Sequence, residues 1–346
     1  MLNNQDFTRD RHLYIGGSDI GAILGLSPYR TPLEVWMDKT GRSTDKANNL
    51  AIRFGNFAED FVANEYALQT QSSLVHYPKP IPHPKYPHLV GHVDRFVVSS
   101  ALLDQSNQKD LFDKKGTCCA SHLLECKTAN PFNQSQWGES GTNQVPLPYL
   151  VQCLWYLAIT NLECADLAVL FSNQDFRIYS IARDLELEQM MIDKALFFWN
   201  NYVLSDVAPP AKCEADYQHL YPIGAKGKST QADSDLFEMI LRLNEVQEEI
   251  KTKELEVGHI KEAVMAKMQD CETLSYEGIT LATWKQPKAS VRFDSKRFSQ
   301  EYPQLYSQFQ NPVPTSRRLV IKNPHAKNVH DTQEPSSNPQ SIAQVI

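Results

Sequence analysis

The chain has 346 residues, 42 % apolar and 10 % aromatic, which is enough to bury a sizeable core. No run approaches the roughly 18 consecutive apolar residues of a membrane-spanning helix, and the first residues lack the pattern of a signal peptide, so we expect a cytoplasmic protein without membrane contacts. The formal charge of −7 excludes a surface coated with basic residues but permits a local basic groove. Seven cysteines without a C-x2-C pair exclude a zinc ribbon and a disulfide framework.

Residues 1–205 alternate helix-like and strand-like segments, which is typical of an α/β domain. In "IGGSDIGAILG" a short helix follows two glycines, and Ser18 is its expected N-cap. The next helix has a capping box that starts at Thr31, and Gly41 is expected to end it. The stretch "RFGNFAEDFVANEYALQ" predicts a further helix from four apolar residues at helical spacing: Phe54, Phe57, Phe61 and Val62.

A proline-rich stretch at 76–88, expected to have no regular structure, leads into "LVGHVDRFVV", which predicts a strand. After a polar insert at 99–120, "SHLLECKTA" predicts the neighbouring strand. The rest of the domain is expected to contain a buried helix in "LPYLVQCLWYLAIT", a hairpin across 172–175, and a long helix in "DLELEQMMIDKALFFWNNYV".

The composition changes at residue 206, where a connector rich in proline, glycine and small polar residues is expected to extend to 232. Residues 233–322 predict a long amphipathic or coiled-coil helix, followed by a small β-rich unit. The tail, 323–346, is polar and contains prolines, so we expect it to be disordered.

The strand "LLECKT" carries the residues that point most clearly to chemistry. Residues two apart share a face of a strand, so Glu125 and Lys127 should lie side by side while Cys126 faces the other way. An isolated E-x-K is usually a surface ion pair, but Asp94 ends or interrupts the preceding apolar strand, where a carboxylate needs a partner. Two carboxylates on adjacent strands predict a site for Mg²⁺ or Mn²⁺, with the Cys126 backbone carbonyl as a further ligand.

Such a trio permits phosphodiester hydrolysis, because the metal ion would activate a water while Lys127 orients or deprotonates it. Glu59 is a further candidate, since Gly55 one turn earlier leaves space beside its carboxylate. Tyr149 and Gln152 share a face of an otherwise apolar helix, as a buried hydrogen-bonding pair or as a substrate contact.

Five motifs occur in order: "IGGSDIGAILGLSPYRTPLEVW", "FGNFAEDF", "GHVDRF", "LLECKT" and "YLVQ". Over roughly residues 7–200 they resemble the YqaJ-type viral recombinases, relatives of phage lambda exonuclease in the PD-(D/E)xK nuclease superfamily. The resemblance implies a restriction-endonuclease-like core: a mixed β-sheet flanked by helices. It also implies an Mg²⁺-dependent exonuclease that degrades one strand of duplex DNA from its 5′ end and leaves a 3′ overhang for a single-strand annealing protein.

Carried over by position, the resemblance assigns Asp94 and Glu125 as metal ligands, Lys127 as the catalytic lysine, and Glu59 as a further acid near the metal. Gln152, with Tyr149, falls on the helix motif behind the site. By the same analogy, a homo-oligomeric ring around the duplex is expected, and the expected cofactor is Mg²⁺, for which Mn²⁺ can substitute.

Arg11 occupies the arginine position of the first motif, and it is expected to hold the 5′-terminal phosphate together with Ser18. Two rival functions stay open: an endonuclease or nickase, which the same metal core would serve, and a non-catalytic DNA-binding scaffold in a recombination complex. A hydrolase that acts on RNA or nucleotides also fits the residues.

Overall fold

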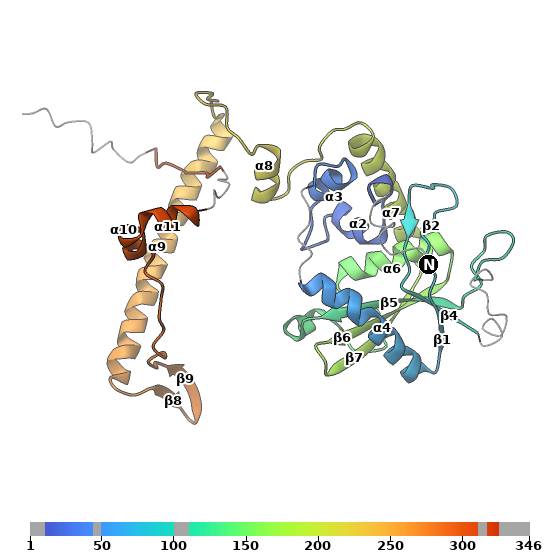
Figure 1. Cartoon of the computed structure of the whole chain (residues 1–346), viewed down its shortest axis with the longest axis horizontal. Coiled ribbons are helices and arrows are strands. Elements are labelled where there is room, and N and C mark those ends of the chain that lie inside the picture. Colours follow the sequence, from blue (N-terminus) through green and yellow to red (C-terminus); the bar gives the residue numbers. More distant parts are fainter. Residues whose placement is uncertain (1–10, 44–49, 100–110, 311–316, 325–346) are drawn as a thin grey trace, which may run out of the picture. The chain divides into compact units, whose positions relative to one another are not determined.

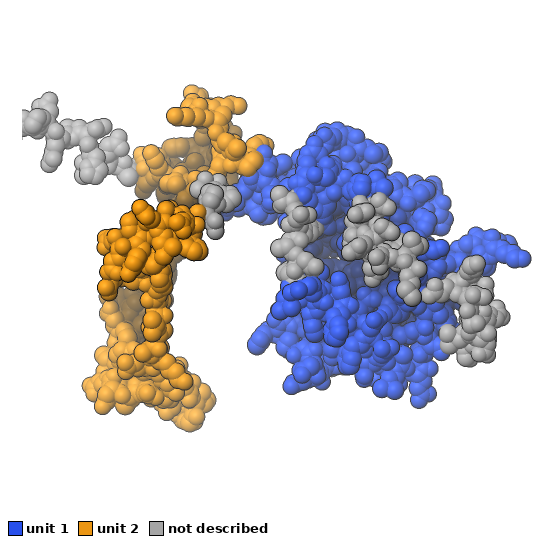
Figure 2. Space-filling view, in the orientation of Figure 1, with its two compact units in different colours: residues 1–220 blue, residues 221–346 orange. Residues whose placement is uncertain are grey.

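The computed structural model describes residues 11–43, 50–99, 111–310 and 317–324. The chain divides into two compact units, Met1–Leu220 and Tyr221–Ile346, which are drawn in blue and orange in Figure 2. The tail expected at 323–346 lies outside the described residues apart from Asn323 and Pro324. Within the described residues, no helix is long and apolar enough to cross a membrane.

Unit 1 is built around a five-stranded sheet with the order β1-β4-β5-β6-β7. Strands β5 and β6 are parallel, and the other neighbours are antiparallel, including the predicted β6–β7 hairpin. The sheet strands are β1 Ser73–Val75, β4 Arg95–Val98, β5 His122–Ala129, β6 Cys164–Phe171 and β7 Asp175–Ala182. The predicted mixed sheet is therefore confirmed.

Helices cover both faces of this sheet (Figure 1). On one face α4 packs Val62, Ala63 and Tyr66 against Val97 and Leu124. On the other face the larger core gathers around α6, whose mostly apolar surface is buried between the sheet and the remaining helices. The helices of unit 1 are η1 Arg11–Leu13, α2 Gly17–Ile23, α3 Pro32–Lys39, α4 Leu50–Thr70, η3 Pro131–Gln136, α6 Leu147–Thr160, α7 Leu185–Phe198, the π-helical turn η4 Trp199–Val203, and α8 Glu214–Leu220.

Helix α4 has the predicted position, but its phenylalanines are not part of the core. Among the four residues that predicted it, only Val62 is buried, whereas Phe54, Phe57 and Phe61 are exposed by 49 %, 80 % and 56 %. The helix instead buries smaller residues against the sheet, which leaves an apolar stripe on the opposite side.

The single strand expected for "LVGHVDRFVV" is two strands in different sheets. Its first part, β3 (Val90–Gly91), pairs with β2 (Ile81–Pro82), so the proline-rich stretch does contain a short strand. Its second part is β4 of the main sheet. Asp94 lies at the change of sheet, which agrees with its predicted place at an interruption of the strand.

Unit 2 contains a helix of 35 residues, α9 (Ser234–Met268), as the heptad-like pattern predicted. The part expected to be β-rich is so only at its start, where β8 (Thr273–Tyr276) and β9 (Ile279–Thr283) form a hairpin. It continues as two short helices, α10 (Ser295–Glu301) and α11 (Pro303–Gln308). The stretch expected to be a connector, 206–232, includes helix α8 of unit 1.

Candidate active site

Strand β5 presents Glu125 and Lys127 on the same side, as the strand periodicity predicted. The Lys127 ammonium forms an ion pair with the Glu125 carboxylate, of which only 2 % of the side chain is exposed. Cys126 points to the opposite face, where it packs in the core beneath α4. The alternation of a buried sheet strand thus places an acid and a base side by side.

Asp94 reaches the same place from the neighbouring strand. Its Oδ2 accepts a hydrogen bond of 2.8 Å from the backbone N–H of Cys126, which fixes its carboxylate beside Glu125. Burial and the neighbouring charge of Glu125 raise the pKa of Asp94 to about 7, and burial likewise raises the pKa of Glu125. For Lys127 burial lowers the pKa, but the two acids outweigh it and the net shift is upward.

The two oxygens of the Glu125 carboxylate differ in their partners. Oε1 accepts from Lys127 and, at 2.6 Å, from the Gln152 amide on α6, whereas Oε2 is buried and has no hydrogen bond from the described residues. The Gln152 amide nitrogen also lies 3.0 Å from the Tyr156 hydroxyl, so α6 orients Glu125 from behind. Gln152 therefore contacts the acidic cluster, as its position on α6 suggested.

Glu59 lies at the edge of the site on α4, where it forms an ion pair with Arg95. Arg95, which directly follows Asp94, is 8 % exposed and forms ion pairs with Glu59 at 2.8 Å and with Asp60. Burial and Asp94 still raise the pKa of Glu59. Sequence reasoning missed Arg95, although a basic residue at the start of an apolar strand was the available signal.

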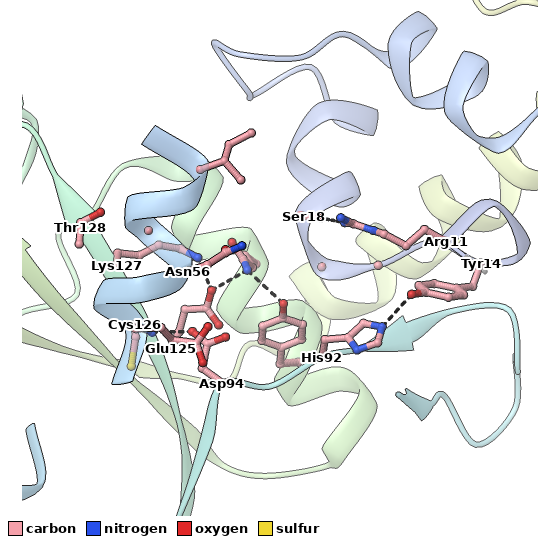
Figure 3. A pocket seen from close by; sticks show the side chains of 17 residues that line it. Arg11, Tyr14, Ser18, Asn56, His92, Asp94, Glu125, Cys126, Lys127 and Thr128 are labelled. Atoms are coloured by element: carbon pink, nitrogen blue, oxygen red, sulfur yellow. Dashed lines mark hydrogen bonds and ion pairs between the residues drawn. The ribbon is translucent and has the colours of Figure 1, made fainter. Parts of the chain in front are cut away.

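The acids line a pocket of about 510 Å³, and Arg11 and Ser18 line its opposite wall (Figure 3). The Arg11 guanidinium donates a hydrogen bond of 2.6 Å to the Ser18 hydroxyl. His92 lies in the wall between them, and its Nε2 is 2.9 Å from the Tyr14 hydroxyl. The structure thus unites in one pocket an acidic cluster and a cationic group that are far apart in the sequence.

The expected N-cap is wrong: Gly16 is the N-cap of α2, and Ser18 is the second helical residue. Gly17 has no room for a side chain, because a Cβ there would lie 2.5 Å from the ring of Tyr156. Close packing against α6 therefore explains why this position is a glycine.

A carboxylate of the protein itself, Asp19, lies at the start of α2 in a buried ion network that the sequence reasoning missed. Asp19 is 1 % exposed and accepts hydrogen bonds from the Gly16 N–H at 3.0 Å, Arg30 at 2.6 Å and Lys39 at 2.6 Å. Despite burial, Lys39 and Arg30 lower the pKa of Asp19 to about 2. Lys39 also donates to the backbone carbonyl of Arg11 at 2.8 Å, so this network holds the segment that carries Arg11.

Tyr149 lies beside the acidic cluster rather than in its pocket. Its ring stacks on Trp137, with centroids 5.2 Å apart, and the Lys127 ammonium lies 6.0 Å from the centroid of the Tyr149 ring. It therefore shares a helix face with Gln152, as predicted, but lines a neighbouring pocket of about 410 Å³.

The donor set fits a hard divalent cation, although no group of three or more His, Cys, Asp or Glu residues suited to a metal ion is found within the described part of the chain. Burial and the charge of Glu125 raise the pKa of Asp94, burial raises the pKa of Glu125, and one buried Glu125 oxygen has no hydrogen bond from the residues that the structure describes. A bound cation would satisfy that oxygen and remove the repulsion.

Residues 6–163 match the model of the YqaJ-like viral recombinase domain. The matched stretch lies entirely within unit 1. The resemblance drawn from the five motifs is therefore confirmed, and the matched stretch of this domain includes Arg11, Glu59, Asp94, Glu125 and Lys127.

Two relatives extend the match. The Bacillus subtilis protein YqaJ is 28 % identical over 334 residues, which cover 93 % of this chain and 97 % of that protein. The Mycoplasma genitalium protein MG373 is 22 % identical over 260 residues, 64 % of this chain and 92 % of that protein. The similarity to the Bacillus protein thus extends beyond the YqaJ-like domain into unit 2.

Among solved structures, the alkaline exonuclease LHK-Exo of Laribacter hongkongensis is similar with a TM-score of 0.45 and 13 % identity, over 59 % of this chain and 94 % of that one. A phage-related exonuclease from Haemophilus somnus is similar with a TM-score of 0.38 and 11 % identity, over 56 % of this chain and 97 % of that one.

Proposed function

We propose that the protein is a metal-dependent deoxyribonuclease that hydrolyses phosphodiester bonds in DNA. The observation that carries the proposal is the cluster of Asp94, Glu125 and Lys127 on two neighbouring strands, open to a pocket and placed within a YqaJ-like viral recombinase domain. Paired carboxylates beside a lysine are suited to phosphoryl chemistry, because they hold a hard cation and supply a positive charge next to it.

In this proposal Asp94, Glu125 and the Cys126 carbonyl hold Mg²⁺ or Mn²⁺, with Glu59 as a further acid nearby. When bound, the cation supplies the charge that lowers the pKa of a water and polarises a phosphoryl oxygen. Hydrogen bonds orient both carboxylate ligands before a cation binds: the Cys126 N–H donates to Asp94, and the Gln152 amide donates to Glu125.

Lys127 is proposed as the catalytic lysine. Its ammonium lies on the pocket side of β5, where it would orient the attacking water and offset the charge that develops on the phosphoryl oxygens. The Lys127 ammonium also lies 6.0 Å from the centroid of the Tyr149 ring, and this cation–π contact would limit its movement.

We further propose that Arg11 and Ser18 bind the 5′-terminal phosphate of the strand being degraded. The guanidinium offers a fork of donors toward the pocket, on the wall opposite the acids, and the buried ion pair of Asp19 and Lys39 fixes the backbone of Arg11. An end anchored there gives degradation in the 5′ to 3′ direction and leaves a 3′ overhang. A single-strand annealing protein is the partner that this product implies, and the cytoplasm is the proposed location.

Self-association is part of the proposal, and helix α9 supports it. Its apolar residues recur at steps of three and four, with one step of seven where Lys253 takes a repeat position, which is the repeat of a coiled coil, and several of them are largely exposed. The residues of this seam are Leu236, Met239, Leu243, Val246, Ile250, Val257, Ile260 and Val264. A second copy of the same helix would bury the seam, and we propose a homo-oligomer on this basis and by analogy with ring-forming relatives.

A time course on linear duplex DNA labelled at the 5′ or the 3′ end, with and without a 5′ phosphate, tests the proposal in Mg²⁺. We expect the 5′ label to be released first, faster from phosphorylated ends, and covalently closed circles to stay intact. Early release of the 3′ label would contradict the direction, and cutting of closed circles would favour an endonuclease.

The anchor is tested by Arg11→Ala. We expect this variant to lose the preference for phosphorylated ends while it still cleaves slowly. An unchanged ratio of the rates on phosphorylated and unphosphorylated ends would remove Arg11 from the phosphate site.

A further inference from the structure

Unit 2 contains a basic stretch at residues 284–298, which begins after β9 and extends into the first turn of α10. It carries five basic side chains and one carboxylate, in a chain whose formal charge is −7. All five basic residues are exposed: Lys285, Lys288, Arg292, Lys296 and Arg297. Helix α9 beside it in the sequence has the opposite balance, with more acidic than basic residues.

Most of this positive charge is not neutralised within the protein. Arg297 pairs with Glu301 at 2.6 Å, and the Asp294 carboxylate is occupied as the N-cap of α10, where it accepts from the Arg297 N–H at 2.9 Å. The other four basic side chains have no ion-pair partner within the described ranges of the chain. Four cations are therefore available for an external anion.

Two large exposed aromatic side chains lie among these cations in the sequence. Trp284 is 50 % exposed and Phe293 is 72 % exposed, and both adjoin a basic residue in the sequence. Between the two aromatics the backbone forms neither helix nor strand and is drawn in Figure 1 as a coil that joins β9 to α10. An open, basic segment with exposed rings has the composition of surfaces that bind single-stranded nucleic acids.

We propose that residues 284–298 bind single-stranded DNA, with their four unpaired cations on the phosphates and with Trp284 and Phe293 stacked on bases. A single strand fits better than a duplex, because duplex bases are already stacked on each other and leave the rings nothing to contact. The choice of DNA over RNA rests on the proposed nuclease function, whose product carries a single-stranded overhang.

The experiment measures binding by the full-length protein of a fluorescent oligothymidylate of about 20 nucleotides, in EDTA so that no metal-dependent hydrolysis can occur. One variant removes the four unpaired cations of the segment: Lys285→Gln, Lys288→Gln, Arg292→Gln and Lys296→Gln. The matched control removes four cations of α9 in the same unit: Lys251→Gln, Lys253→Gln, Lys261→Gln and Lys267→Gln. Both variants change the net charge equally.

We expect the segment variant to lose affinity on the order of a hundredfold at about 0.15 M salt, and its salt slope to fall by about 3, since each phosphate contact contributes about 0.7 to the slope. The α9 control should stay close to the parent. Trp284→Ala should weaken binding at least about fivefold, since a stacked base contributes about 1–3 kcal/mol.

Equal affinities of the segment variant and the α9 control would overturn the proposal. So would an unchanged affinity of Trp284→Ala together with equal losses on single strands and duplexes, which would indicate a general polyanion surface. Tighter binding of oligouridylate than of oligothymidylate would overturn the choice of DNA. Because binding is measured without Mg²⁺, a failure of the nuclease proposal appears separately, as absent hydrolysis with intact single-strand binding.

Discussion

Replacement of Asp19 by Asn should destabilise unit 1 severely. The carboxylate is 1 % exposed and neutralises two cations at once, Lys39 with a 2 % exposed side chain and Arg30 with 15 %. Asparagine keeps the shape but removes the charge, so Lys39 in particular stays buried without a counter-ion. Breaking one partner of a buried ion pair costs about 3–5 kcal/mol, which is a large fraction of the stability of an ordinary domain.

The assay is urea unfolding followed by circular dichroism, with Asp206→Asn as the matched control. Asp206 also pairs with an arginine, Arg42, but both side chains are exposed, by 58 % and 43 %. Such a surface pair is worth about 0–1 kcal/mol, so the control should unfold close to the parent. If the free energy of unfolding of Asp19→Asn lies within about 1 kcal/mol of that of Asp206→Asn, the buried network does not stabilise the fold.

Three further outcomes are expected. The pKa of Asp19 is about 2 in the folded state and 3.8 ordinarily, so its stabilising contribution is present above about pH 4 and is lost toward pH 2. Between these pH values the free energy of unfolding of the parent should fall by about 2 kcal/mol more than that of Asp19→Asn, as measured by urea unfolding at each pH. Gly17→Ala should lower the free energy of unfolding by about 1–3 kcal/mol, because its Cβ would meet a tyrosine ring on α6, whereas Gly55→Ala, with open space around the added Cβ, should not; equal effects would contradict the close packing. Ile250→Glu in the α9 seam should shift the protein to monomers in light scattering, while Leu255→Glu should not, because Leu255 is apolar and at least as exposed but lies outside the repeat. An unchanged mass for both variants would remove α9 from self-association.

The strand arrangement of the site could be predicted from the sequence because it depends on local periodicity. The alternation around Glu125 and Lys127 sets which side chains share a face, and a carboxylate at the end of an apolar run marked Asp94. The start of helix α3 could also be predicted from the sequence, since Thr31 and Glu34 form the reciprocal hydrogen bonds of the predicted capping box.

The missed features all depend on contacts between distant segments. Nothing near Asp19 indicates that Lys39 will be buried against it, and nothing near Arg95 indicates that Glu59 will lie 2.8 Å away. The role of Gly17 is decided by Tyr156, more than a hundred residues later. Periodicity gave the α4 helix but not the exposure of Phe57, because which side of a helix is buried depends on the partner surface.

The most direct test of the account is the release of nucleotides from linear duplex DNA in Mg²⁺ by Lys127→Ala, with Lys115→Ala as an exposed control. Both variants should be folded by circular dichroism, and the account predicts that only Lys127→Ala loses hydrolysis, by at least about a hundredfold. Mg²⁺-dependent degradation by Lys127→Ala at the rate of the parent would contradict the assignment of this pocket as the active site.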